Sequence, residues 1–185
     1  MRDEDRQGAE PSDLELVERG RSGEDAALSA LAKRHHAAAY RVALSFVRED
    51  DLAQDVVQDA FVKAFRALAG FRADASFRTW LLTITANEAK GALRRQGRRK
   101  ETALEEAEEV RSDEGGPAHD AVLQDESARA RKMLEQLPEK QRLSVTLRID
   151  EGLSFKEIGE VIGSSEGAAR VNYFHGIRRL RELMA

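Results

Sequence analysis

The sequence predicts an all-α protein with two small helical domains joined by a flexible acidic linker, the C-terminal domain being a helix-turn-helix. Charged residues make up 35% of the 185 residues and aromatic residues only 5%, a composition typical of small helical units with large solvated faces. Apolar residues recur at helical spacing over most of the chain. The main exception is an acidic stretch around Gly115, Gly116 and Pro117, which has no apolar period and is typical of a linker.

These patterns divide the chain into four parts. Residues 1–12 are polar and without period, which predicts a disordered tail. Residues 13–97 form the first helical domain, residues 98–127 the acidic linker and residues 128–185 the second helical domain. Because nothing in the linker supplies a core, we expect the two domains to fold separately.

The net charge of −4 conceals an uneven distribution along the chain. Residues 72–100 carry eight basic and two acidic residues, a balance of +6, whereas residues 101–127 carry one arginine and ten acids, a balance of −9. Residues 167–181 hold four arginines and no acid. Two basic stretches separated by an acidic one predict two local nucleic-acid contacts.

Several classes of protein are excluded by the residues that are absent. The chain has no cysteine, which rules out disulfide scaffolds, thiolate metal sites and cysteine nucleophiles. Its four histidines form no ligand cluster, and no phosphate-binding glycine motif or nucleophile–base pair occurs, so we expect no catalytic residue, metal or cofactor. The sequence has no long apolar run of the kind that marks a signal peptide or a membrane span. A cytoplasmic protein is therefore predicted.

Helical runs are predicted near residues 14–17, over 24–46 and over about 50–68. The last run has a broad apolar arc, and its opposite side carries Asp55, Asp59, Val62 and Arg66. That side is typical either of a solvated charged face or of a docking surface, and an apolar Val62 within it favours docking. A carboxylate metal site is a weaker alternative, because no histidine has matching spacing.

A further helix is predicted from Ser76, which can cap it, to about Arg95. Trp80 packs on its apolar side, and a buried position is the common fate of a lone tryptophan. Another side presents hydrogen-bonding and basic groups suited to phosphates and bases, namely Thr83, Asn87, Lys90 and Arg94.

The second domain has clear helix boundaries. Pro138 suits the first turn of a helix that runs to about Asp150, Ser154 and Glu157 form a capping box, and Gly163 allows a tight turn before the last helix. This order of elements is a helix-turn-helix.

The last helix, which ends near Met184, has two distinct sides. We expect its apolar side to close the core with Ala169, Tyr173, Ile177, Leu180 and Met184. The other side is suited to the major groove and carries Arg170, Val171, Phe174, His175 and Arg178. A helical hairpin with a basic surface is the alternative.

Two blocks of the chain resemble the extracytoplasmic-function (ECF) sigma factors of bacterial RNA polymerase. The second conserved region of that family is similar to DLAQDVVQDAFVKAFRAL followed by FRADASFRTWLLTITANEAKGALRRQGRR. Its fourth region is similar to LPEKQRLSVTLRIDEGLSFKEIGEVIGSSEGAARVNYFHGIRRLREL, and a weaker match is ALSALAKRHHAAAYRVALSFV. The two motifs occur in the family's order, separated by a linker of the right kind.

The resemblance implies a non-catalytic subunit that binds core RNA polymerase, directs it to promoter DNA and helps to melt that DNA. It implies core-polymerase contacts at Asp55, Asp59, Val62 and Arg66. It implies minus-10 contacts, to the melted non-template strand and the duplex edge, at Phe71, Arg72, Ser76, Trp80, Thr83, Asn87, Lys90 and Arg94. It implies minus-35 contacts at Ser165, Arg170, Val171, Phe174, His175 and Arg178, and a cognate anti-sigma factor as a further partner.

The chain departs from the family pattern in the last helix. Ala168 and Ala169 replace a more usual Thr-Val pair, and Asn172 stands where a basic residue is common. The promoter sequence is therefore not transferable from relatives. The alternative function is a stand-alone helix-turn-helix regulator of duplex DNA, which would have no need of an acidic docking face in the first domain.

Overall fold

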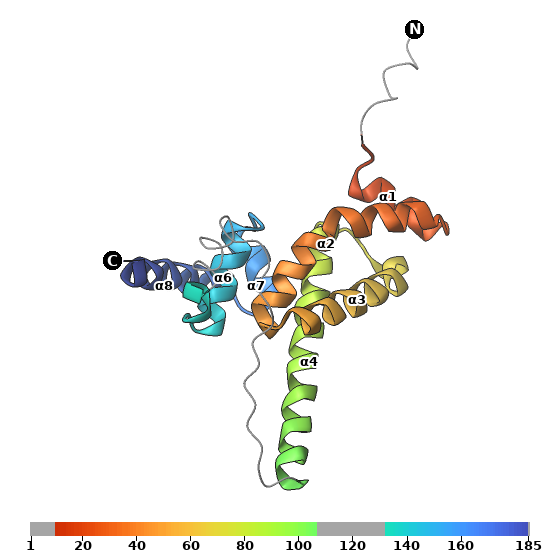
Figure 1. Ribbon diagram of the computed structural model, residues 1–185. Helices are drawn as coiled ribbons and strands as arrows, with labels where there is room; N and C mark the ends of the chain where they lie inside the picture. Colours follow the sequence, from red (N-terminus) through yellow and green to blue (C-terminus); the bar gives the residue numbers. More distant parts are fainter. Residues whose placement is uncertain (1–9, 107–131, 185) are drawn as a thin grey trace, which may run out of the picture.

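The computed structural model describes residues 10–106 and 132–184, and within these ranges every regular element is a helix (Figure 1). The predicted all-α class is confirmed. Most of the acidic linker and the first nine residues of the predicted tail lie outside the described residues. The elements are α1 (Asp13–Arg21), α2 (Asp25–Val47), α3 (Asp50–Arg66), the 3₁₀ turn η2 (Leu68–Gly70), α4 (Phe77–Glu106), α6 (Glu139–Ile149), α7 (Phe155–Ile162) and α8 (Glu166–Met184).

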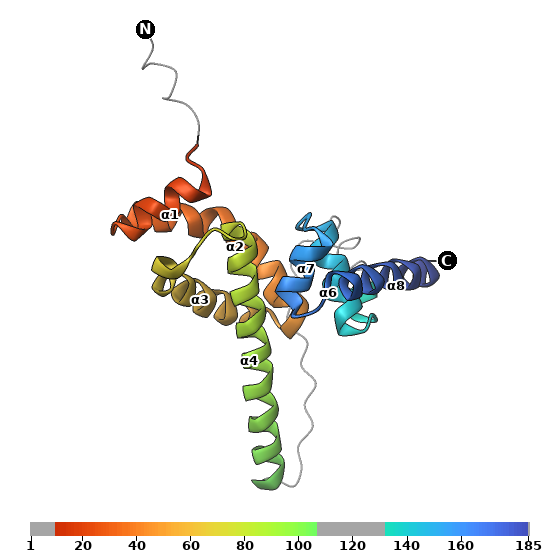
Figure 2. The same ribbon diagram turned by 180° about the vertical axis from the view of Figure 1, so that it is seen from behind.

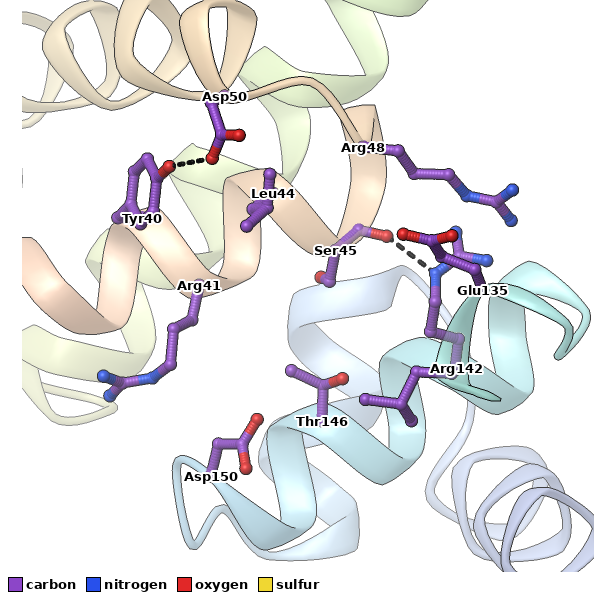
Figure 3. A pocket seen from close by; sticks show the side chains of 11 residues that line it. Tyr40, Arg41, Leu44, Ser45, Arg48, Asp50, Glu135, Arg142, Thr146 and Asp150 are labelled. Atoms are coloured by element: carbon purple, nitrogen blue, oxygen red, sulfur yellow. Dashed lines mark hydrogen bonds between the residues drawn. The ribbon is translucent and has the colours of Figure 1, made fainter. Parts of the chain in front are cut away.

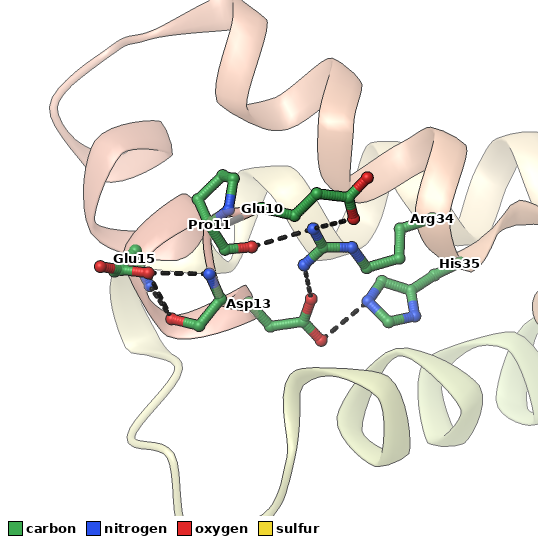
Figure 4. Close-up of polar contacts among 7 residues, drawn as sticks. Glu10, Pro11, Asp13, Glu15, Arg34 and His35 are labelled. Carbon is green, nitrogen blue, oxygen red and sulfur yellow. Dashed lines mark hydrogen bonds and ion pairs between the residues drawn. The ribbon is translucent and has the colours of Figure 1, made fainter. Parts of the chain in front are cut away.

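The first helix is capped and attached to the second by polar contacts. Ser12 forms a capping box with Glu15, in which the Glu15 amide donates to Ser12 Oγ over 3.3 Å and Glu15 Oε2 accepts from the Ser12 amide over 2.8 Å. Asp13 then accepts from Arg34 Nη1 over 2.7 Å and pairs with His35 Nε2 over 2.8 Å (Figure 4). These contacts hold α1 against the middle of α2.

Helices α2, α3 and α4 pack together as the first domain (Figures 1 and 2). Ser76 Oγ accepts from the Thr79 amide over 3.1 Å, so the predicted cap of α4 is confirmed. The predicted end of this helix near Arg95 is wrong, since α4 continues to Glu106 through residues assigned to the linker. Residues 98–106 contain no glycine or proline and are mostly good helix formers, so a helix persists where no core is available.

The second domain contains the predicted helix-turn-helix. Ser154 and Glu157 form the capping box of α7, and Gly163 ends that helix with a left-handed φ of 71°. A Cβ on Gly159 would lie 2.8 Å from the Ser164 carbonyl oxygen, so glycine there permits the tight turn. Met184 is 72% exposed rather than in the core, because α8 extends beyond the helices on which it packs (Figure 1).

The two domains lie against each other. Helix α2 packs on α6 and α4 packs on α7, and the buried apolar residues of both domains form one continuous core. Helix α8 lies on the far side of α6 and α7 and points away from the first domain (Figures 1 and 2). Separate folding of the two domains stays a prediction, while the contact between them was not foreseen from the sequence.

Candidate polymerase and nucleic-acid surfaces

The outward face of α3 is built as the helical pattern predicted. Asp55, Asp59 and Arg66 are exposed, and Val62 among them is 42% exposed. The opposite side of the same helix is buried in the core through Val56, Val57, Ala60 and Ala64. An exposed apolar side chain that follows two carboxylates along the same helix face is suited to contact with another protein.

A groove of about 420 Å³ lies beside this face, between α3 and α4. Asp55 and Asp59 line one wall, and Arg95 and Arg99 of α4 line the other. The groove therefore offers carboxylates and guanidinium groups to the same partner. The sequence did not predict the basic wall, because the arginines lie about forty residues further along the chain.

Between α3 and α4, the chain presents some predicted minus-10 residues and buries another. Arg72 is 83% exposed at its side chain. Phe71 is only 5% exposed, and its ring lies 5.0 Å from that of Trp80 and 6.0 Å from that of Phe77. This burial places Phe71 in an aromatic cluster that anchors the start of α4, and its contact with DNA stays a prediction.

The four residues predicted to form the reading face of α4 are not equally available. Asn87 and Arg94 are exposed. Thr83 donates its hydroxyl to the Thr79 carbonyl of the same helix over 2.9 Å. Lys90 Nζ donates to the Ile162 carbonyl at the end of α7 over 3.0 Å, and burial lowers the pKa of Lys90. Half of the predicted face is thus engaged within the protein.

Helix α8 presents its predicted face to solvent. Val171 is 55% and Phe174 61% exposed, and His175 is exposed beside them. Arg170 pairs with Glu166 over 2.8 Å and lies 5.2 Å from the centre of the Phe155 ring. Such an arginine keeps its charge at the surface, in a place where a phosphate or a base could replace Glu166.

The remaining two predicted residues of this face lie at its ends. Ser165 precedes α8, and its Oγ accepts from the Ala168 amide over 3.1 Å. Arg178 is exposed and pairs with Glu182 over 3.2 Å. Ser165 therefore caps the helix, which sets the direction in which the N-terminal end of α8 faces.

Glu151, in the turn after α6, is the main contact between the domains that the sequence did not reveal. Its side chain is fully buried and accepts from Arg41 Nε of α2 over 2.6 Å and from Arg78 Nη2 of α4. Arg78 Nη1 also donates to the Glu151 carbonyl over 2.7 Å. The hydrogen bond to Glu151 raises the pKa of Arg41. A glutamate in an Asp-Glu-Gly turn normally predicts a solvated residue, so no sequence signal indicated this role.

A second contact joins the α4 and α7 helices. Thr79 donates its hydroxyl to Glu157 Oε1 over 2.9 Å, while Glu157 Oε2 serves the capping box of Ser154. Burial acts to raise the pKa of Glu157, but the hydrogen bonds from Ser154 and Thr79 outweigh it and lower the pKa. One carboxylate thus caps α7 and attaches it to the first domain.

A cavity of about 440 Å³ opens between α2 and α6 (Figure 3). Arg142, 4% exposed, crosses beside it and donates from Nε to the Ser45 carbonyl over 2.9 Å. At the other end, burial raises the pKa of Asp150. The cavity is lined by Tyr40, Arg41, Leu44, Ser45, Arg48, Asp50, Leu134, Glu135, Arg142, Thr146 and Asp150.

Within residues 10–106 and 132–184, no group of three or more histidine, aspartate or glutamate side chains is arranged to hold a metal ion. None of the described helices combines the length and apolar character that crossing a membrane requires.

Comparison with known proteins gives the class of this chain. The family model for Sigma-70 region 2 matches residues 31–99, and that for Sigma-70 region 4 matches residues 127–180. The RNA polymerase sigma-H factor of Pseudomonas aeruginosa is 38% identical over 170 residues, covering 88% of each protein. The ECF RNA polymerase sigma-E factor of Escherichia coli K12 is 36% identical over 171 residues, covering 88% of this chain and 89% of the relative.

Solved structures agree with this assignment. CnrH, solved in complex with the cytosolic domain of CnrY, aligns with a TM-score of 0.67 at 27% identity, over 91% of this chain and 94% of CnrH. The sigma factor RpoE of Bartonella quintana, solved with the anti-sigma factor NepR, aligns with a TM-score of 0.68 at 25% identity, over 84% of this chain and 95% of RpoE.

The two family models and these relatives show that the chain is a sigma factor, a transcription initiation factor that directs RNA polymerase to promoters. Within that class, the chain belongs to the ECF sigma factors. The family is one of non-enzymatic initiation factors.

Proposed function

We propose that this sigma factor docks on core RNA polymerase through the outward face of α3, with Asp55, Asp59, Val62 and Arg66 as the contacts. The observation that carries this proposal is the exposure of Val62 within an acidic surface. A protein partner can cover the valine while pairing with the carboxylates, and covering apolar area contributes about 25 cal/mol per Å². Arg95 and Arg99 extend the same contact across the groove.

The minus-10 element would be bound by the α3–α4 connection and by α4. Arg72 would contact the strand backbone, and its 83% exposed side chain supports this role. Asn87 and Arg94 are free on the surface of α4 to contact the duplex edge, and Lys90 would join them once it leaves the Ile162 carbonyl. Phe71 and Trp80 would support this surface from beneath. Ser76 would support it by capping α4, and Thr83 would lie at its margin.

The minus-35 element would be read in the major groove by α8. Val171 and Phe174 supply exposed apolar surface for thymine methyl groups, and Arg170 supplies a fork of donors for guanine or phosphate. His175 and Arg178 follow along the same helix, and Ser165 fixes its start.

The restraint of this sigma factor by a cognate anti-sigma factor is part of the proposal. It is supported by the RpoE of Bartonella quintana, a structural relative that was solved with the anti-sigma factor NepR. We further propose that the chain acts in the cytoplasm, beside the polymerase, and has no catalytic activity of its own.

In vitro transcription tests the proposal most directly. Purified protein is mixed with core RNA polymerase and genomic DNA, and the 5′ ends of the transcripts are sequenced. We expect discrete start sites that share two spaced upstream elements. Specific duplex binding without polymerase association would instead favour the stand-alone helix-turn-helix regulator.

A charge-reversal pair tests the docking face separately. Asp55→Lys with Asp59→Lys should weaken core association by at least about tenfold, since close like charges at an interface cost several kcal/mol. The matched control reverses two exposed acids elsewhere, Asp25→Lys and Glu160→Lys. Equal affinity of both variants for core polymerase would remove α3 as the docking face.

A further inference from the structure

The exposed loop between η2 and α4 has a fixed base. Its outer part, Arg72 to Asp74, is open to solvent, with the side chains of Arg72 and Asp74 83% and 81% exposed. Ala73 between them has a φ of 59°, which a residue with a Cβ rarely adopts. Leu68 and Phe71, which precede this part, are 3% and 5% exposed. The loop therefore projects from a buried base in one particular backbone conformation.

Arg21, the last residue of α1, holds that base. Its Nε donates to the Leu68 carbonyl over 3.0 Å, and its Nη2 donates to the Phe71 carbonyl. One guanidinium thus bridges the two carbonyls that bracket the turn, and Glu18 pairs with the remaining Nη1. A planar fork of donors fits two carbonyls at once, whereas a lysine ammonium is a single point of attachment.

The backbone of α1 lies close enough to make this bridge possible. Gly20 precedes Arg21, and a Cβ there would lie 2.5 Å from Leu28 Cδ2 and 3.2 Å from Leu68 Cδ2. Glycine therefore allows α1 to touch both α2 and η2. Figure 1 shows the end of α1 and the α3–α4 connection at the same end of the first domain. Helix α1 also lies before the residues matched by the region 2 model, which begin at residue 31.

We propose that Arg21 is a positioning residue that fixes the base of the 71–76 loop for binding of single-stranded promoter DNA, an inference that rests on the proposed minus-10 role of that loop. A loop already held in its bound conformation loses less entropy when a strand binds. Arg21 itself is only 27% exposed at its side chain, and it acts through the two carbonyls rather than on DNA.

Hydrogen exchange tests the positioning without reference to function. In the full chain, Arg21→Ala and Arg21→Lys should speed amide exchange in residues 68–76 by at least about tenfold, as a loop gains local opening. Arg19→Ala is the matched control, because Arg19 is an exposed arginine of the same helix whose side chain pairs with Glu24, away from the loop. Unchanged exchange in both Arg21 variants would overturn the proposal.

DNA binding by the holoenzyme tests the consequence. The probe is a fluorescent single-stranded oligonucleotide carrying the non-template minus-10 sequence of a start site mapped with the wild-type protein. We expect both Arg21 variants to bind it about three- to tenfold more weakly, with core-polymerase affinity within about twofold of wild type, and Arg19→Ala to match wild type.

The outcomes separate the two levels of inference. If the Arg21→Lys holoenzyme bound the probe with wild-type affinity, charge alone would suffice and the bridging role would be overturned. An equal loss of core affinity and DNA affinity would indicate general unfolding and would also overturn it. Absence of probe binding by the wild-type holoenzyme would refute the minus-10 assignment itself, while the exchange data would still decide whether Arg21 holds the loop.

Discussion

The two helices predicted to contact promoter DNA differ in how far the protein itself covers them. On α8, Val171 and Phe174 are more than half exposed, and Arg170 is paired only at the surface with Glu166. On α4, Lys90 is bound to the end of α7 and Thr79 to Glu157. The second domain therefore lies against α4, the helix proposed to contact the minus-10 element, but leaves open its own α8, the helix proposed to contact the minus-35 element.

The groups that cover α4 have the electrostatic character of DNA. Glu151 and Glu157 present carboxylates to Arg78 and Thr79, and the end of α7 presents a carbonyl, the negative pole of a helix, to Lys90. Cationic and donor groups that could contact phosphates are satisfied by anionic groups of the same chain. A surface rich in donors can therefore be evident from the sequence and still be occupied in the folded protein.

Among variants that alter how the second domain covers α4, Glu151→Ala is expected to have the largest effect. It removes the carboxylate shared by Arg41 and Arg78, and hydrogen bonds to charged groups contribute about 1.5–3 kcal/mol each. Because both arginines can reach water, the substitution should shift the free energy between packed and separated domains by about 2–3 kcal/mol toward the separated state. Small-angle X-ray scattering should report a larger radius of gyration than in wild type.

The control for this variant is Glu160→Ala, which removes an exposed acid of α7. It should leave the radius of gyration unchanged. If Glu151→Ala remained as compact as wild type, Glu151 would not be what holds the domains together.

The open face is tested by Arg170→Ala. Loss of a base or phosphate contact should weaken binding of a minus-35 duplex by about 1–3 kcal/mol, with thermal stability nearly unchanged because the residue is exposed. Fluorescence anisotropy measures the affinity. Arg179→Ala, an exposed arginine about 180° around the same helix, should have a much smaller effect, and equal losses in the two variants would contradict the assignment of this face.

A smaller effect on the covered face is expected from Thr79→Val. The substitution keeps the shape of the side chain but removes the donor to Glu157, which costs about 1 kcal/mol. The domains should separate about fivefold more readily, measured by energy transfer between dyes on the two domains. The capping box of Ser154 and Glu157 should persist, so loss of helix content would point to misfolding rather than domain separation.

The smallest effect concerns the first domain alone and depends on pH. Burial lowers the pKa of His35, outweighing the neighbouring Asp13, while the nearby Arg78 and Arg34 also lower it. Below about pH 6.5 the unfolded chain takes up a proton that the folded chain resists. The free energy of unfolding should therefore fall as the pH drops below about 6.5, by at most about 1.4 kcal/mol per pH unit from this group.

Urea unfolding at pH 5.5 and pH 7.5 measures this dependence. His35→Gln should reduce it, and the matched control is His36→Gln, which changes an exposed histidine of the same helix that stacks on Phe61. Equal pH dependence in wild type and His35→Gln would show that His35 contributes nothing to it.

Local features of the fold could be predicted from the sequence because their causes are local. The caps at Ser76 and Ser154 follow from residues within three positions, and the outward side of α3 follows from helical spacing. The predicted end of α4 near Arg95 lies too close to the N-terminus, because it was set by where a core is needed. The residues beyond it favour a helix by their own propensity, and α4 continues to Glu106.

The candidate site was predicted less completely than the helices that carry it. The family resemblance and the periodicity placed Asp55, Asp59 and Val62 on the surface of α3, where the structure has them. Phe71, for which a DNA contact is predicted, is buried because its ring completes an aromatic cluster with Phe77 and Trp80. No local pattern distinguishes an aromatic that binds a partner from one that anchors a loop.

The sequence by itself determined the all-α class, the helix-turn-helix and the surfaces that two separate domains would expose. Only the tertiary structure decided that Glu151 is buried between Arg41 and Arg78, that Lys90 closes the end of α7, and that Arg21 holds the loop before α4. The physical reason is distance along the chain. Periodicity and capping act over a few residues, whereas these contacts join groups that only the folding of the whole chain brings together.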